Sequence, residues 1–114
     1  MTIRKIQELL DADILLGEDQ IDCNAEFVFS SDMMSDVLAY AEEQSVLITG
    51  LCNPQVVRTA EMLDIVCIIF VRGKTPDQAI LSLAEEKKIV ILCTRHFMFT
   101  TCGILYSSGL RGGA

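Results

Sequence analysis

The sequence has no long hydrophobic run, because its longest apolar stretch is the seven residues 65–71. A membrane-spanning helix needs about 20 apolar residues, so we expect no membrane span. The first five residues lead into a mixed helical pattern and lack the apolar segment of a secretory signal. We therefore expect a cytoplasmic protein that makes no contact with a membrane.

None of the five cysteines forms a Cys-x-x-Cys pair, the spacing that marks zinc sites and thioredoxin-like redox motifs. Their odd number argues against a disulfide framework. Cys52 and Cys93 fall near the ends of expected strands and His96 follows closely, so these three side chains could hold a soft metal. The alternative is that the thiols are inert. We expect no metal, with Cys52, Cys93 and His96 as the candidates should one bind.

Basic residues are scarce: 9 Lys and Arg stand against 16 Asp and Glu, and the formal net charge is −7. Proteins that bind nucleic acid or anionic membranes present a basic face, so neither is an expected partner. The charge is uneven, because residues 1–64 carry 13 acidic and 3 basic side chains whereas residues 65–114 carry 3 acidic and 6 basic. Such asymmetry can favour head-to-tail association or create a local anion site.

Catalytic and nucleotide-binding motifs are missing as well. The sequence has no Walker A motif and no Gly-x-Gly-x-x-Gly, since Gly50 and Gly73 are isolated. His96 is the only histidine, and no nucleophile-elbow motif is present, so we do not expect a hydrolytic triad. Asp32 is expected to cap a helix. We assign no catalytic residue and no cofactor, and we do not expect an enzyme.

What the chain does have is 51% hydrophobic residues, arranged as alternating strand and helix patterns. Strands are predicted over residues 25–29, 46–49, 65–71 and 89–93, and helices over residues 3–10, 33–41, 53–63, 75–88 and 96–106. Thr75 and Pro76 are expected to open the fourth of these helices. A short apolar run at residues 14–16 is left unassigned.

Strands that are apolar on both faces and alternate with helices are typical of a parallel sheet covered on both sides. We therefore predict a single three-layer α/β domain over residues 1–110, with a mostly parallel sheet of about four to five strands and helices on both faces. Residues 111–114 are expected to form a flexible C-terminal tail.

Ligands of such sheets bind outside the C-terminal ends of the strands. The loops expected there contain three cations together with helix-capping groups, and this combination favours binding of a phosphorylated small molecule. The alternative is that these side chains are ordinary solvated loop residues. The candidate ligand-binding residues are Thr49, Asn53, Gln55, Arg72, Lys74, Thr75 and Arg95.

The middle of the chain carries a family resemblance. Residues 31–39, Ser-Asp-Met-Met-Ser-Asp-Val-Leu-Ala, resemble a helix start in stand-alone DRTGG-domain proteins, and the similarity continues in order through residues 46–49, 53–57, 63–70, 91–94 and 99–106. The family is named after an Asp-Arg pair that follows the central strand and a Thr-Gly-Gly that follows the next one. Here the first place reads Leu51-Cys52-Asn53-Pro54, and the second reads Val71-Arg72-Gly73, with only Gly73 matching.

The resemblance implies a regulatory or interaction module, because DRTGG domains are similar to the N-terminal domain of HPr kinase/phosphorylase and occur in CBS-domain pyrophosphatases. Together with the apolar composition, it favours a non-catalytic module that self-associates as a homodimer or binds another protein. The alternative is a sensor of a nucleotide or other phosphorylated small molecule at the strand ends. A third hypothesis is a metal- or redox-linked accessory protein of hydrogenase-type systems, because stand-alone relatives are encoded near iron-only hydrogenase subunits.

Overall fold

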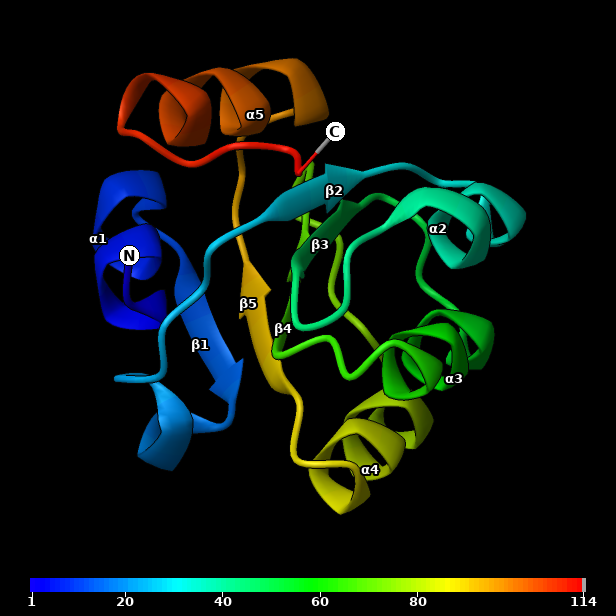
Figure 1. The fold of residues 1–114 in the computed structure, drawn as a ribbon. Helices are drawn as coiled ribbons and strands as arrows, with labels where there is room; N and C mark the ends of the chain where they lie inside the picture. Colours follow the sequence, from blue (N-terminus) through cyan, green and yellow to red (C-terminus); the bar gives the residue numbers. More distant parts are fainter. Residues whose placement is uncertain (114) are drawn as a thin grey trace.

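The computed structural model describes residues 1–113, and within them the chain forms one five-stranded sheet with the strand order β1-β5-β4-β3-β2 (Figure 1). Strands β2 to β5 are parallel and β1 runs antiparallel to β5. The elements in chain order are α1 (Ile3–Leu10), β1 (Asp13–Leu16), the 3₁₀ turn η1 (Glu18–Gln20), β2 (Val28–Ser30), α2 (Met34–Tyr40), β3 (Val46–Thr49), α3 (Pro54–Met62), β4 (Cys67–Phe70), α4 (Gln78–Glu86), β5 (Val90–Cys93) and α5 (Met98–Ser107).

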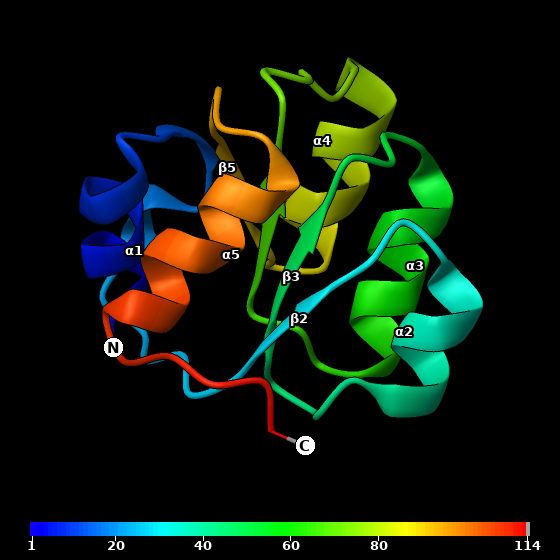
Figure 2. The ribbon, with the colours of Figure 1, turned by 90° about the horizontal axis from the view of Figure 1, so that it is seen from above.

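Helices cover both faces of the sheet, which confirms the predicted three-layer α/β fold (Figures 1 and 2). Helices α1 and α5 pack on one face, and α2, α3 and α4 pack on the other. Successive side chains of a strand point to opposite faces, so every residue of β3 and β4 is buried on one side or the other. The continuous apolar strands of the sequence are the direct cause of this double covering.

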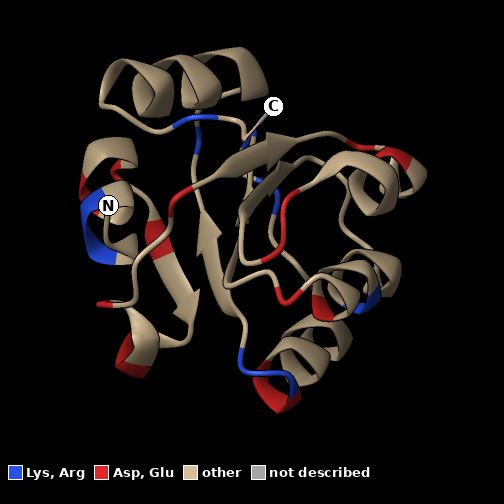
Figure 3. Ribbon diagram, viewed as in Figure 1, with Lys and Arg blue, Asp and Glu red and all other residues tan. Residues whose placement is uncertain are grey.

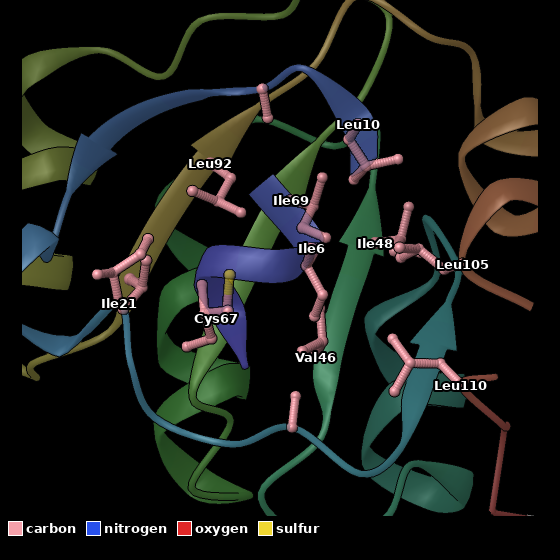
Figure 4. Packing of buried hydrophobic residues seen from close by; sticks show 14 of the residues in the cluster. Ile6, Leu10, Ile21, Val46, Ile48, Cys67, Ile69, Leu92, Leu105 and Leu110 are labelled. Carbon is pink, nitrogen blue, oxygen red and sulfur yellow. The ribbon is translucent and has the colours of Figure 1, made fainter. Parts of the chain in front are cut away.

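The layer beneath α1 and α5 shows how the strand alternation is used. Ile48 and Ile69 project from β3 and β4 toward α1 and α5, where they meet Ile6 and Leu10 of α1 and Leu105 of α5 (Figure 4). Burial of an aliphatic side chain of this size contributes about 1.5–3 kcal/mol, so this layer supplies a large share of the folding free energy. It also fixes α5 firmly to the sheet by its inward side.

Strand β1 is an element that the sequence patterns missed. Its register pairs Asp13 with Cys93 and Ile14 with Leu92, and an irregularity follows before Leu16. The strand is short and only half-buried, and therefore lacks the continuous apolar pattern of the four parallel strands. Gly17 ends it with a φ of 89° against β5, where a Cβ would lie 2.9 Å from the Cα of Val90.

The largest errors in the predicted boundaries were at α4 and β2. The helix α4 begins at Gln78 rather than at Thr75-Pro76, because the carboxylate of Asp77 accepts a hydrogen bond from the Ile80 N–H at 3.0 Å. Strand β2 is shorter than the predicted 25–29, since the N–H of Ala25 donates to the Met1 carbonyl instead of to β3. No helix within residues 1–113 is long and apolar enough to cross a membrane.

The segment after α5, Leu110 to Gly113, lies along β2 and is called the strap below (Figures 1 and 2). Leu110 is buried, and the Arg111 carbonyl accepts a hydrogen bond from the Val28 N–H at 2.9 Å. Of the expected tail, Arg111 is therefore held at this position, and Ala114 lies outside the described residues. The domain boundary at residue 110 stays a prediction.

One buried side-chain oxygen in the described residues has no hydrogen-bond partner, and it leads to a prediction about stability. The Thr59 hydroxyl in α3 is fully buried and unpaired. We expect Thr59→Val to raise the free energy of unfolding by about 1 kcal/mol, because it removes an unpaired polar group at nearly constant volume. Chemical denaturation measures the change.

The matched control is Thr101→Val in α5. Thr101 is equally buried, but its hydroxyl donates to the Phe97 carbonyl at 2.9 Å. Its replacement should lower the free energy of unfolding by about 1 kcal/mol. Equal losses of stability in the two variants would contradict the assignment of Thr59 as unpaired.

Candidate functional site

The C-terminal ends of the four parallel strands meet at one edge of the sheet, as the sequence predicted. The register places Thr49 beside Phe70 and Phe70 beside Cys93, so the loops after β3, β4 and β5 are neighbours. Hydrogen bonds tie these loops together directly. The Arg72 N–H donates to the His96 carbonyl and the Gly73 N–H donates to the Thr94 carbonyl, both at 2.9 Å.

Asp32 holds the loop after β2 to the end of β3. One carboxylate oxygen accepts hydrogen bonds from the Thr49 hydroxyl at 3.0 Å and from the Gly50 N–H at 2.7 Å. The expectation that Asp32 caps a helix was therefore wrong, and the N-cap of α2 is Met33, which has no side-chain cap. The carboxylate finds donors across the sheet edge, and these tertiary partners have no signature in the local sequence.

Thr49, the first of the predicted ligand-binding residues, is fully buried at this position. Its hydroxyl donates to Asp32 and accepts from the Leu51 N–H at 3.1 Å. The hydroxyl therefore both donates and accepts a hydrogen bond within the protein. The geometry gives Thr49 a structural part in shaping the edge.

Arg72 reaches across from the loop after β4 to the end of β3. Its guanidinium donates to the Gly50 carbonyl at 3.5 Å, and a Cβ at Gly50 would lie only 2.7 Å from its Nη2 atom. Gly50 is therefore bonded through its N–H to Asp32 and through its carbonyl to Arg72. Arg72 itself has a φ of 63°, a left-handed conformation that is costly for a residue with a Cβ.

The other predicted residues lie in three different places. Asn53 caps α3 as expected, since its Oδ1 accepts from the Val56 N–H at 3.3 Å, and Gln55 is exposed in the first turn of that helix. Thr75 and Arg95 line a cleft of about 580 Å³ on the β5 side of the edge. Lys74 is exposed, and its carbonyl accepts a hydrogen bond from the Cys93 thiol at 3.0 Å.

The same cleft contains two carboxylates that the sequence reasoning missed, those of Asp11 and Asp13. Because β1 is antiparallel to β5, its first residue lies at the edge where the parallel strands end. The sequence signal was the pair Asp11 and Asp13 directly after the first helix, but it required knowledge that β1 joins the sheet. These acids offset the positive charge of Arg95, so the cleft is less suited to an anion than predicted.

Cys52 and Cys93 are both half-buried near this edge. Burial raises the pKa of the Cys52 thiol, although the nearby Lys74 and Arg72 charges act in the opposite direction. Burial also raises the pKa of Cys93, with a smaller contribution from the charge of Asp13. A raised pKa keeps a thiol protonated, which disfavours metal binding and nucleophilic attack. Within residues 1–113 no three metal-ligating side chains cluster.

A comparison with known proteins finds that the sequence model of the DRTGG domain matches residues 5–108. Among solved structures, the chain is similar to the CBS and DRTGG domains of the regulatory region of Clostridium perfringens pyrophosphatase, solved as a complex with its activator, diadenosine tetraphosphate. The TM-score is 0.77 at 21% sequence identity, over 94% of this chain and 46% of that one. This likeness shows a shared fold, and the chain spans about half of the solved neighbour. No curated protein matches.

The contact between Gly50 and Arg72 predicts a coupled pair of substitutions. In Gly50→Ala the new methyl group should displace the Arg72 guanidinium, at a cost of about 1 kcal/mol or less, because the clash involves only the end of a flexible side chain. In an Arg72→Ala background the same change should be nearly neutral. A double-mutant cycle by chemical denaturation measures the coupling, and additive effects would contradict it.

Proposed function

We propose that this chain, which belongs to the DRTGG domain family, is a non-catalytic regulatory module that acts through protein contact and associates as a homodimer. The observation that carries the proposal is a group of three exposed aromatic side chains at α5. Phe97, Phe99 and Tyr106, at the start of α5 and along it, are 67%, 90% and 63% exposed. Scattered exposed apolar residues are normal, whereas three aromatic side chains on one small helix suggest an interaction surface.

The composition of α5 supports the same conclusion. Residues 98–107 include no charged side chain, and apolar residues occur on both the inward and the outward sides of the helix. A helix that is apolar all round is normally buried on all sides. Since the sheet covers only the inward side, the outward side is left for a partner.

The polar edge of the sheet is consistent with a module that lacks catalysis. Its most buried polar side chains, Thr49 and Thr94, bond to the protein itself, Thr94 through a hydroxyl that donates to the Leu10 carbonyl at 3.2 Å. The raised pKa values of Cys52 and Cys93 disfavour thiol chemistry. These contacts hold the loops in place, and the proposed output of the protein is contact through α5.

Sedimentation equilibrium of the full chain at micromolar concentration tests the proposed dimer. We expect a mass twice the 12.6 kDa of the chain, because an apolar face of this kind is stabilised when a second copy covers it. The apparent mass should fall toward that of the single chain on dilution. A mass of one chain at every concentration would contradict self-association.

A second candidate function is a sensor of a phosphorylated small molecule at the strand ends. The observation that favours it is the similarity to a regulatory region solved with diadenosine tetraphosphate. The exposed cations Arg72, Lys74 and Arg95 would supply the positive charge for such a polyanion. The acids Asp11 and Asp13 work against it on the β5 side of the edge.

A thermal-shift titration with diadenosine tetraphosphate tests the sensor. A ligand that binds only the folded state stabilises it by about 2.7 kcal/mol at one hundred times its Kd, which raises Tm by several degrees. The double variant Arg72→Glu/Arg95→Glu should lose this shift because it reverses the charge of the site. The matched control Lys5→Glu/Arg58→Glu makes the same charge change on exposed residues of α1 and α3 and should keep it. No shift in the unmodified chain, or an equal shift in both variants, would contradict the sensor.

A further inference from the structure

An apolar recess of about 370 Å³ adjoins the outward side of α5. Val28 of β2, Gly103 and Tyr106 of α5, and Leu110 and Gly112 of the strap contribute to its lining. β2 is far in the sequence from α5 and the strap, which follow each other along the chain, and the fold brings all three side by side (Figure 2). A cavity of about 150 Å³ is enough to bind benzene, so the recess has the volume to accept an aromatic ring.

The strap that borders the recess is held in place by Arg111. The Arg111 guanidinium lies 4.2 Å from the centroid of the Tyr106 ring and donates to the carbonyls of Tyr106 and Leu110 at 3.0 and 2.8 Å. On the other side, the Arg111 carbonyl accepts from the Val28 N–H. The strap, which forms one wall of the recess, is thus anchored both to the end of α5 and to the edge of the sheet. A group that binds there would meet a wall that is already ordered.

A protruding side chain borders this recess. Phe99 is 90% exposed and lies one helical turn before Gly103, with Tyr106 nearly one turn further on. Residues spaced by four and then three positions share one side of a helix. A Cβ added at Gly103 would meet no atom within 4 Å, so the helix surface is open between the two aromatic rings. The protruding Phe99 side chain, called the knob below, and the recess therefore lie on the same surface, as a two-fold interface between identical copies requires.

Charge indicates which partner fits this surface. The chain carries a formal charge of −7, so two copies repel each other over most orientations. Helix α5 carries no charged residue, whereas Asp and Glu are distributed over the other helices and the loops (Figure 3). A basic partner would be drawn to the acidic regions. A second acidic copy meets the least repulsion at α5.

The exposed aromatic area on α5 is also of the order that a dimer interface buries. At their observed exposures, Phe99 and Tyr106 present about 300 Å² of aromatic surface, given about 150–250 Å² for each such side chain. A standard interface buries about 800 Å² on each partner. These two side chains therefore supply about a third of what a stable dimer needs, and the recess and strap lie directly beside them.

From the knob, the recess, the charge and the area we infer that a second copy of this chain binds across α5 in a two-fold interface. Phe99 of each copy enters the recess beside Gly103 and Tyr106 of the other. This inference rests on the self-association proposed above and identifies the face that mediates it. The two α5 helices approach each other at Gly103, where the missing side chain allows close contact.

Sedimentation equilibrium of three single variants tests the face. Phe99→Glu removes the knob and adds a charge near the helix N-terminus, where an acid is compatible with the helix dipole. Gly103→Gln fills the open surface with an uncharged side chain that a helix prefers to glycine. Met62→Glu is the matched control, because Met62 is 69% exposed on α3, on the other side of the sheet.

We expect dimerisation to weaken by about 30-fold or more in Phe99→Glu and Gly103→Gln, as for central interface residues, and to be unchanged in Met62→Glu. At a dilution where the chain is a single copy, Gly103→Gln should also raise Tm. That increase would show that its loss of dimers does not come from misfolding. This combination of results supports the inference.

Two other outcomes overturn it and are distinguishable. If the unmodified chain is a dimer and all three variants remain dimers, the interface lies elsewhere, and the self-association of the proposed function still stands. If the unmodified chain is a single copy at every concentration, the proposed homodimer fails together with the inferred interface. The occupant of the α5 face would then be a different protein.

Discussion

The physical constraint on which the structure depends is the burial of both faces of four parallel strands. Every residue of β3 and β4 is buried, and the alternation of side chains divides them between two hydrophobic layers. Each layer requires helices to exclude water, so α1 and α5 pack on one face and α2, α3 and α4 on the other. Parallel connection through these helices also brings the C-terminal ends of the strands to one edge.

At that edge, polar side chains hold the loops to one another. Asp32 accepts a hydrogen bond from the Gly50 N–H, and Arg72 donates one to the Gly50 carbonyl. These two bonds connect the loops after β2, β3 and β4. The backbone bonds from Arg72 and Gly73 to His96 and Thr94 extend the connection to the loop after β5. An edge fixed in this way can present a ligand surface of stable shape, and Arg95 shares its cleft with the acids Asp11 and Asp13.

Helix α5 has two roles in this arrangement. Its inward side completes one hydrophobic layer through Leu105, and its outward side places Phe99 and Tyr106 at the surface. The strap then turns back along β2 and is fixed by Arg111, which forms one border of an apolar recess. The proposed interaction surface and the hydrophobic core therefore lie on opposite sides of one helix, and that helix packs directly on the sheet.

Much of the fold could be predicted from the sequence, because continuous apolar strands and helical apolar stripes are local patterns. The strands predicted over residues 46–49 and 89–93 agree closely with β3 and β5. The Asn53 cap with Pro54 correctly predicted the start of α3. Boundaries were less accurate where two signals competed, as at Thr75 and Asp77. The resemblance to DRTGG domains rested on segments spread along the chain, and the family match over residues 5–108 confirms it.

By itself, the sequence determined the layer architecture, the parallel direction of the main strands and the edge at which polar loops gather, because these follow from hydrophobic periodicity along the chain. Only the tertiary structure decided that β1 adds Asp13 to this edge, that Asp32 bonds to Thr49 and Gly50 instead of capping a helix, and that Arg111 holds the strap against Tyr106. Each of these contacts joins residues through directional hydrogen bonds or ring packing between separate elements. Their partners are chosen by the three-dimensional positions of those elements, and no local pattern records them.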